Sequence, residues 1–294
     1  MANTTALKRR IGSVKNTRQI TKAMELVAAS KMKKAQAQAL ATRDYRESAQ
    51  AILSRLSAVS DVAQNPMFST RPVRQHLLIV ITSDLGLAGG YDGNVIKQIT
   101  AQIERNQKAK VSTSVVAIGR KGGQFFSRLR DVNVASAYAM FNDNPKPGDI
   151  RPIITSAIKQ FEEEKVDKVT IVYTEFISNL SQEVKLLDVL PARAPAHREG
   201  DKLVSELEVA FFEPDIEAIV DDAVLRLIEV QLWQSLLESL ASEYSMRMVA
   251  MKNASDNAGD IIDDLTLAYN TARQSAITQE IAEIVGGAEA VAQT

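Results

Sequence analysis

The chain has 294 residues, of which 45% are hydrophobic and 24% are charged, a balance typical of a folded protein with a buried core. It contains no cysteine, which excludes disulfides, thiolate metal sites and thiol redox chemistry. The formal net charge is only -1, but residues 1–47 hold eleven Lys and Arg against three Asp and Glu, whereas residues 213–294 hold four against fifteen.

The N-terminal segment, residues 1–65, predicts one long helix. Residues 13–65 contain neither Gly nor Pro and are rich in strong helix formers, and Asn65-Pro66 gives a stop signal. Its later part has an apolar seam spaced by four and three residues: Tyr45, Ala49, Ile52, Leu56 and Val59. Its earlier part has a less regular apolar face: Ile11, Val14, Ile20, Met24, Val27, Ala28, Met32 and Ala35.

The middle segment, residues 71–205, has a different pattern. Short runs rich in Val and Ile, at 77–81, 115–118, 132–134 and 169–173, alternate with helical stretches near 94–108 and 149–164. A further run at 184–190 predicts an edge strand. Strands that alternate with helices predict a Rossmann-like α/β domain with a mostly parallel sheet.

The C-terminal segment, residues 212–294, predicts a second long helix with an apolar seam. Its seam keeps a 3.5-residue repeat for about eight heptads, which is typical of a coiled coil. The seam positions are Ile216, Val220, Ala223, Leu227, Val230, Gln234, Leu237, Ala241, Tyr244, Met248, Met251, Ser255, Ala258, Ile262, Leu265, Tyr269, Ala272 and Ala276.

The two terminal helices are predicted to pair with each other. They carry opposite charge, both have apolar seams, and the α/β domain connects the end of one to the start of the other. We therefore predict a long antiparallel coiled coil with the α/β domain beside it. Beyond Ala276 the apolar residues move to a new face, made of Ile277, Ile281, Ile284, Ala288 and Val291, so we expect that tip to extend into another protein.

A glycine-rich loop at 83–91 follows the first predicted strand, where α/β proteins often bind phosphate. It matches neither the dinucleotide fingerprint nor the Walker motif, so a tight structural turn is favoured. The alternative is a nucleotide-binding α/β enzyme that uses Asp84 and Gly86–Gly90. The Gly-Arg-Lys-Gly-Gly stretch at 119–123 is interpreted in the same way as a turn.

Catalytic chemistry has no strong candidate in this sequence. The only histidines are His76 and His197, and the adjacent pairs Asp221-Asp222 and Asp263-Asp264 point about 100° apart on a helix. The basic N-terminal helix is a candidate for nucleic-acid binding, but few aromatic residues interleave with its charges, and pairing with acidic protein is favoured.

Four motifs carry a resemblance to a known family. They read IGSVKNTRQITKAMELVAASKM at 11–32, MRMVAMKNASDN at 246–257, YNTARQ at 269–274 and ITQEIAEIVGGAEA at 277–290. Together they resemble the gamma subunit of F-type ATP synthase, over essentially the whole chain.

The resemblance implies a non-catalytic central rotor shaft without a cofactor. Its partners would be three alpha and three beta subunits, the epsilon subunit and the membrane c-ring, with no nucleic acid. It would couple rotation of the c-ring of a proton-translocating enzyme to conformational change at the catalytic sites of the alpha/beta hexamer. The residues implied to contact that hexamer are Lys22, Met24, Arg247, Gln274, Thr278, Glu280 and Glu283.

Membrane association is expected to be indirect. The polar start of the chain lacks a signal-peptide core and no apolar run could cross a bilayer, so we expect a peripheral position on the cytoplasmic side of a bacterial inner (plasma) membrane. In the glycine-rich loop, Leu85 and Ala88 replace the family's usual Arg and Cys, which leaves the role of those two positions open here.

Overall fold

The structure, a computed structural model, describes residues 2–59, 65–129, 132–139, 145–192 and 216–292. The chain forms two compact units. The smaller unit comprises Met1–Ala28 and Arg247–Thr294, and the larger unit comprises Ala29–Met246. The predicted fold class is confirmed: two long terminal helices accompany an α/β domain with a mostly parallel sheet. The predicted segments 1–65, 71–205 and 212–294 remain a prediction.

The C-terminal helix α6 spans Ile216–Ala292 and buries the predicted seam. Every described seam position from Val220 to Ala276 is buried or half-buried, including the polar Gln234 and Ser255. Residues beside the seam are often exposed, as Ile261 is next to the buried Ile262. The 3.5-residue pattern therefore marks the face that packs, as a coiled-coil seam requires.

The N-terminal helix α1 spans Ala2–Val59, and its seam differs from the apolar face that the sequence predicted. Ile20 and Val27 are exposed, with Ile20 at 60%. The reason is that the 3.5-residue repeat runs through polar Thr21 and Glu25, which are half-buried. A prediction based on apolar residues alone therefore departs from the true seam at these positions. The side chains of Ile52, Leu56 and Val59 lie outside the described residues.

In each unit, taken separately, α1 and α6 run antiparallel. In the smaller unit the guanidinium of Arg18 lies against Gly259. In the larger unit the Nζ of Lys31 lies 5.7 Å from the ring centroid of Tyr244. Residues later on α1 meet earlier residues on α6 in a groove lined by Tyr45, Ser48, Ala49, Ile219, Asp222, Ala223 and Arg226.

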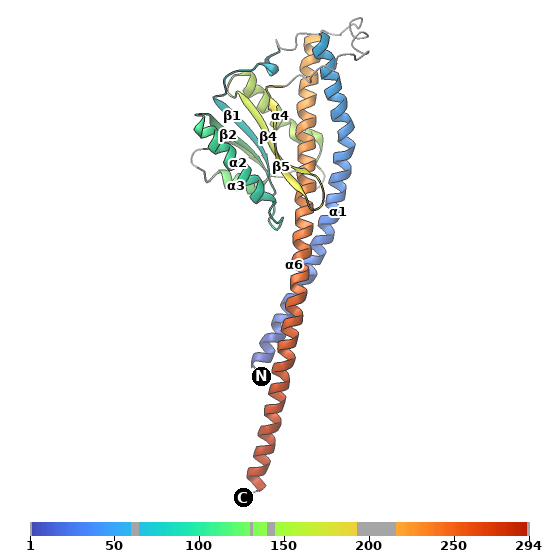
Figure 1. Cartoon of the computed structure of the whole chain (residues 1–294), viewed down its shortest axis with the longest axis vertical. Coiled ribbons are helices and arrows are strands. Elements are labelled where there is room, and N and C mark those ends of the chain that lie inside the picture. The colour runs from blue at the N-terminus through green and yellow to red at the C-terminus, as the bar shows by residue number, and fades with distance from the viewer. Residues whose placement is uncertain (1, 60–64, 130–131, 140–144, 193–215, 293–294) are drawn as a thin grey trace. The chain divides into compact units, whose positions relative to one another are not determined.

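The sheet of the larger unit has five strands in the order β3-β2-β1-β4-β5. Figure 1 labels β1, β2, β4 and β5 in this sheet. The first four strands are parallel, and β5 pairs with β4 in the antiparallel direction, as predicted for an edge strand. The strand bounds are β1 Gln75–Ile81, β2 Ser112–Ile118, β3 Asn133–Tyr138, β4 Lys168–Phe176 and β5 Gln182–Leu190.

Helices cover both faces of this sheet. Helices α2 (Tyr91–Lys108) and α3 (Arg120–Phe126) pack on one face around Leu78, Val80 and Ile99. Helix α4 (Pro147–Glu162) and the first part of α6 pack on the other face. The short 3-10 helix η2 spans Pro66–Phe68. The predicted turn at 119–123 is wrong in part, because Arg120 begins α3 directly after Gly119.

A buried histidine ties β1 to its neighbours. The hydroxyl of Thr170 donates to Asp188 at 2.7 Å, so it accepts from Nε2 of His76 at 2.8 Å. Nδ1 of His76 then accepts from the Asn106 amide at 3.1 Å. Asn106 Oδ1 also lies 3.4 Å from Nδ1, so it is mainly the burial of the ring that favours the neutral imidazole.

This histidine should make the fold sensitive to mild acid. Burial lowers the pKa of His76 below 6.5, and the charge of Lys168 acts in the same direction, against Asn106 and Asp188. The unfolded chain therefore binds the proton first, and stability is lost as the pH falls below about 6.5, by at most about 1.4 kcal/mol per pH unit. Urea unfolding at pH 7, 6 and 5 measures the loss. In His76→Gln the dependence over this range should disappear, and an unchanged slope would contradict this role.

Candidate partner-binding site

The tip of α6 exposes a row of large apolar side chains. Ile281 is 56% exposed and Ile284 is 71% exposed, and Ile277 and Val285 are also exposed. Within the smaller unit, Arg18 meets Gly259, so the first described residue of α1 would come level with Ser275. Beyond that point no described residue of α1 is left to pair with α6. Exposed apolar residues gathered in this way are typical of a surface that binds another protein.

The polar residues predicted at this tip lie on the surface of the same helix. Gln274, Thr278, Glu280 and Glu283 are all exposed. The hydroxyl of Thr278 donates to the carbonyl of Gln274 at 2.9 Å, and the carboxylate of Glu283 accepts from Gln279 at 3.0 Å. These contacts are local to α6, so each side chain can still reach a partner.

The smaller unit also holds a basic groove beside α1. Its cavity has a volume of about 500 Å³. Three cations on one side of α1, Lys15, Arg18 and Lys22, face Asp256 on α6. Lys22 is exposed and pairs with Glu25 at 3.0 Å, and the neighbouring Met24 is half-buried. The groove can therefore accept an acidic group from outside.

Arg247 lies in a different environment from Lys22. Its side chain is buried, with 8% exposed, whereas the sequence led us to expect that both residues face a partner. Arg247 lies four residues before Met251, which is also buried and occupies the seam of α6. Residues four apart share one face of an α-helix, so the arginine belongs to the packed side of α6.

Charge reversal should separate these two residues. Lys22→Glu should leave the unfolding free energy within about 0.5 kcal/mol, since the side chain is exposed, but weaken partner binding. Arg247→Glu should cost about 3–5 kcal/mol because it places an acid in a buried position. Thermal melts of the two isolated variants measure this difference, and equal melting temperatures would refute it.

The two carboxylates in and beside the glycine-rich loop already have partners. The carboxylate of Asp84 accepts the backbone N–H of Arg120 at 2.8 Å and lies 3.5 Å from its guanidinium. The carboxylate of Asp92 accepts from both the backbone N–H and the hydroxyl of Ser83. Leu85 and Leu87 are exposed and Ala88 is buried. These pairings support the structural turn that the sequence favoured.

One glycine near this loop has no room for a side chain. Gly119 has φ of 106°, a conformation that other residues rarely adopt, and an added Cβ would overlap the carbonyl of Thr82. We expect Gly119→Ala to cost about 3 kcal/mol or more in unfolding free energy. Gly93→Ala is the matched control, because Gly93 lies in α2 with nothing near its Cβ, and it should be neutral or stabilising by up to about 1 kcal/mol. Urea titration of both variants compares the two costs, and a mild effect at Gly119 would contradict the geometry.

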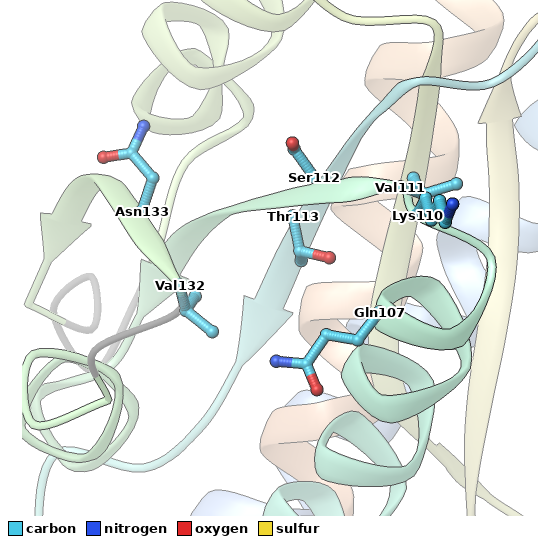
Figure 2. A pocket seen from close by; sticks show the side chains of 7 residues that line it. All are labelled: Gln107, Lys110, Val111, Ser112, Thr113, Val132 and Asn133. Carbon is cyan, nitrogen blue, oxygen red and sulfur yellow. The ribbon is translucent and has the colours of Figure 1, made fainter.

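A cavity of about 770 Å³ opens at the amino ends of β2 and β3. The side chains of Gln107, Thr113 and Val132 point toward a common space there (Figure 2). Its lining is Gln107, Lys110, Val111, Ser112, Thr113, Val132 and Asn133, without any carboxylate or histidine. Lys110 is therefore the one side chain of this lining that could act as a general acid or base, and it has no second such group beside it in the lining.

The described part of the chain contains neither a metal cluster nor a spanning helix. Among these residues no group of three or more His, Asp or Glu side chains is placed to hold a metal ion. Over the same residues, no helix combines the length and apolar character needed to cross a membrane.

Comparison with known proteins identifies the family. The family model described as ATP synthase matches residues 3–291. The ATP synthase gamma chain of Pelotomaculum thermopropionicum is 41% identical over 285 residues, which cover 97% of this chain and 98% of that protein. The chain belongs to the ATP synthase gamma chain family. Its Heliobacterium modesticaldum relative is 39% identical over 288 residues, with 97% of this chain and 98% of that protein covered.

Solved structures agree with this family. The central stalk and c-ring structure of Tetrahymena thermophila mitochondrial ATP synthase contains a chain with a TM-score of 0.62 and 28% identity, covering 80% of this chain and 99% of that one. A chain in the Euglena gracilis mitochondrial ATP synthase has a TM-score of 0.63 and covers 99% of this chain and 95% of that one. Because the two chains are only 15% identical, this match is evidence for the fold alone.

Proposed function

We infer that this chain is the central rotor subunit of a proton-translocating F-type ATP synthase. The observation that carries this function is the full-length match to gamma chains, which covers the α/β domain and both terminal helices. A gamma chain is a non-catalytic subunit, so this chain couples rotation to catalysis that takes place on other subunits.

We propose that the tip of α6 is the part held by the alpha/beta hexamer. Exposed Ile277, Ile281 and Ile284 lie on the same helix as the exposed polar residues Gln274, Thr278, Glu280 and Glu283. A hexamer that surrounds the tip would cover the apolar row, while the polar side chains offer hydrogen bonds at its rim. Lys22 and Met24 would contribute from α1, where the basic groove suits an acidic loop of the hexamer. Arg247 would act from a buried position, by holding the shape of α6.

We propose further that the α/β domain meets the epsilon subunit and the c-ring. The chain would then be attached indirectly to the cytoplasmic side of a bacterial inner membrane. No feature of the glycine-rich loop favours the alternative of a nucleotide-binding enzyme, because the carboxylates of Asp84 and Asp92 already have partners within the loop and α3.

Reconstitution tests the rotor function. Purified alpha and beta subunits are mixed with and without this chain, and the assembled complex is isolated and assayed for ATP hydrolysis. We expect one copy of this chain per hexamer and a higher rate of hydrolysis when it is present. A chain that stays outside the hexamer, or that leaves the rate unchanged, would show that the rotor assignment is wrong.

A further inference from the structure

The carboxyl end of β4 extends beyond its neighbour β1. The parallel pairing between them ends at Val80 and Val172, but β4 continues to Phe176. On its other side β4 remains paired with β5, where Thr174 lies opposite Val184. The backbone of Thr174 therefore has a strand on one side and none on the other, and its buried polar groups need other partners.

Two serines of α6 supply those partners. The backbone N–H of Thr174 donates to Oγ of Ser239 at 3.1 Å, and Oγ of Ser242 donates to the carbonyl of Thr174 at 3.2 Å. Both serines are fully buried. Because they lie three residues apart, they share one face of the helix. The helix thus takes the place of the missing strand at this residue.

A third serine holds the turn that follows β4. Oγ of Ser245 donates to the carbonyl of Asn179 at 3.0 Å and accepts from the side chain of Gln182 at 3.4 Å. Ser245 lies three residues beyond Ser242 and is also fully buried. All three serines therefore fasten α6 to one end of the β4–β5 pair.

A second attachment lies earlier on α6. Arg151 of α4 pairs with Glu229 at 3.2 Å, and Glu229 also pairs with Arg226 at 2.7 Å. Glu229 and Ser245 are sixteen residues apart, which is about 24 Å along a helix. Attachment at two levels resists tilting of the α/β domain against α6. Between them the contact is mainly apolar, and apolar packing is not directional.

We propose that Ser239, Ser242 and Ser245 form the joint that transmits torque between the α/β domain and α6. The proposal rests on the proposed rotor function, in which partners of the α/β domain turn the shaft. Rotation of the domain about the axis of α6 would carry β4 sideways past the serines. Hydrogen bonds lose strength steeply when donor and acceptor are misaligned, so these bonds resist that movement where apolar contacts would allow sliding.

The test uses the whole ATP synthase in membrane vesicles. The ratio of ATP-driven proton pumping to ATP hydrolysis is measured for the complex that carries Ser239→Ala with Ser242→Ala. We expect this ratio to fall at least about fivefold, which is the factor that corresponds to the loss of two hydrogen bonds at the weak end of their usual range. Ser239→Thr with Ser242→Thr keeps both hydroxyls and should restore most of the ratio. Ser156→Ala, which removes an exposed hydroxyl of α4, is the matched control and should leave it unchanged.

The possible outcomes separate the joint from the rotor function. Fully assembled alanine complexes with an undiminished ratio would overturn the joint. A loss that the threonine variants do not restore would also overturn it, provided that the added methyl groups leave assembly and melting temperature unchanged. If the double variant does not assemble, the ratio is measured for Ser245→Ala, which removes the bond to Asn179 and leaves Thr174 paired. A lower ratio then supports the joint, and an unchanged ratio overturns it. A wild-type chain that supports no pumping in the same vesicles would instead refute the rotor function itself.

Discussion

Ile262→Asp should destabilise the smaller unit strongly, whereas Ile261→Asp should hardly affect it. Ile262 is 8% exposed on the α6 seam, and its neighbour Ile261 is 48% exposed. An aspartate at 262 would lose the apolar burial and place a carboxylate in the seam, which together cost about 3–5 kcal/mol. The same residue at 261 faces water, where substitutions usually stay within about 0.5 kcal/mol.

Thermal melting of the two isolated variants, followed by far-ultraviolet circular dichroism, compares these costs. The pair is closely matched, because the two changes are chemically identical and adjacent in sequence. Equal melting temperatures for both variants would mean that the 3.5-residue repeat does not mark the packed face of α6.

The double variant Ile281→Asp with Ile284→Asp should keep the stability of the isolated chain but lose binding to its partners. Both side chains are exposed, so the unfolding free energy of the isolated chain should stay within about 1 kcal/mol of the wild type. In the hexamer these side chains would be covered by a partner, and each buried charge without a counter-ion would cost several kcal/mol. We therefore expect the variant to bind alpha and beta subunits weakly and to lose most of its stimulation of ATP hydrolysis.

Reconstitution with purified alpha and beta subunits measures this loss. Leu267→Asp is a suitable control, since Leu267 is as exposed as Ile284 but lies before the tip. If the control abolishes stimulation and the tip variant retains it, the hexamer does not hold this chain at the tip of α6.

The sequence predicted the elements whose pattern is local. The seam of α6 could be predicted because apolar residues recur every three or four positions along the helix. Strand β1 could be predicted because its apolar run is uninterrupted, as in a strand buried on both faces. The edge position of β5 was also predictable, because its run at 184–190 mixes charged with apolar residues. In all three cases the pattern and the neighbours required the same structure.

The errors arose where polar or small residues occupy packed positions. Thr21 and Glu25 hold seam positions of α1, whereas the prediction placed the apolar Ile20 and Val27 on its packed face, where they do not lie. Helix α3 was missed because two of its seven residues are glycine, which lowers helix propensity. Its tertiary contacts, with Gly122 against Thr82, outweigh that propensity.

The proposed joint was invisible in the sequence for a different reason. Ser239 and Ser242 are ordinary serines in a long helix, where the side chain usually bonds to the helix's own carbonyl. Their role depends on the point at which β1 ends beside β4, which no pattern within α6 encodes. Burial of Arg247 has the same origin, since it depends on how α6 packs and not on its charge.

Observation of rotation tests the rotor function most directly. Because the chain contains no cysteine, a single cysteine placed at an exposed position of α2, such as Lys97→Cys, allows one bead to be attached to it. The alpha/beta hexamer that holds the labelled chain is fixed to a surface and supplied with ATP. We predict that the bead turns continuously in one direction and stops when ATP is withdrawn. A bead that only fluctuates about a fixed angle, on hexamers that hydrolyse ATP, would contradict the assignment.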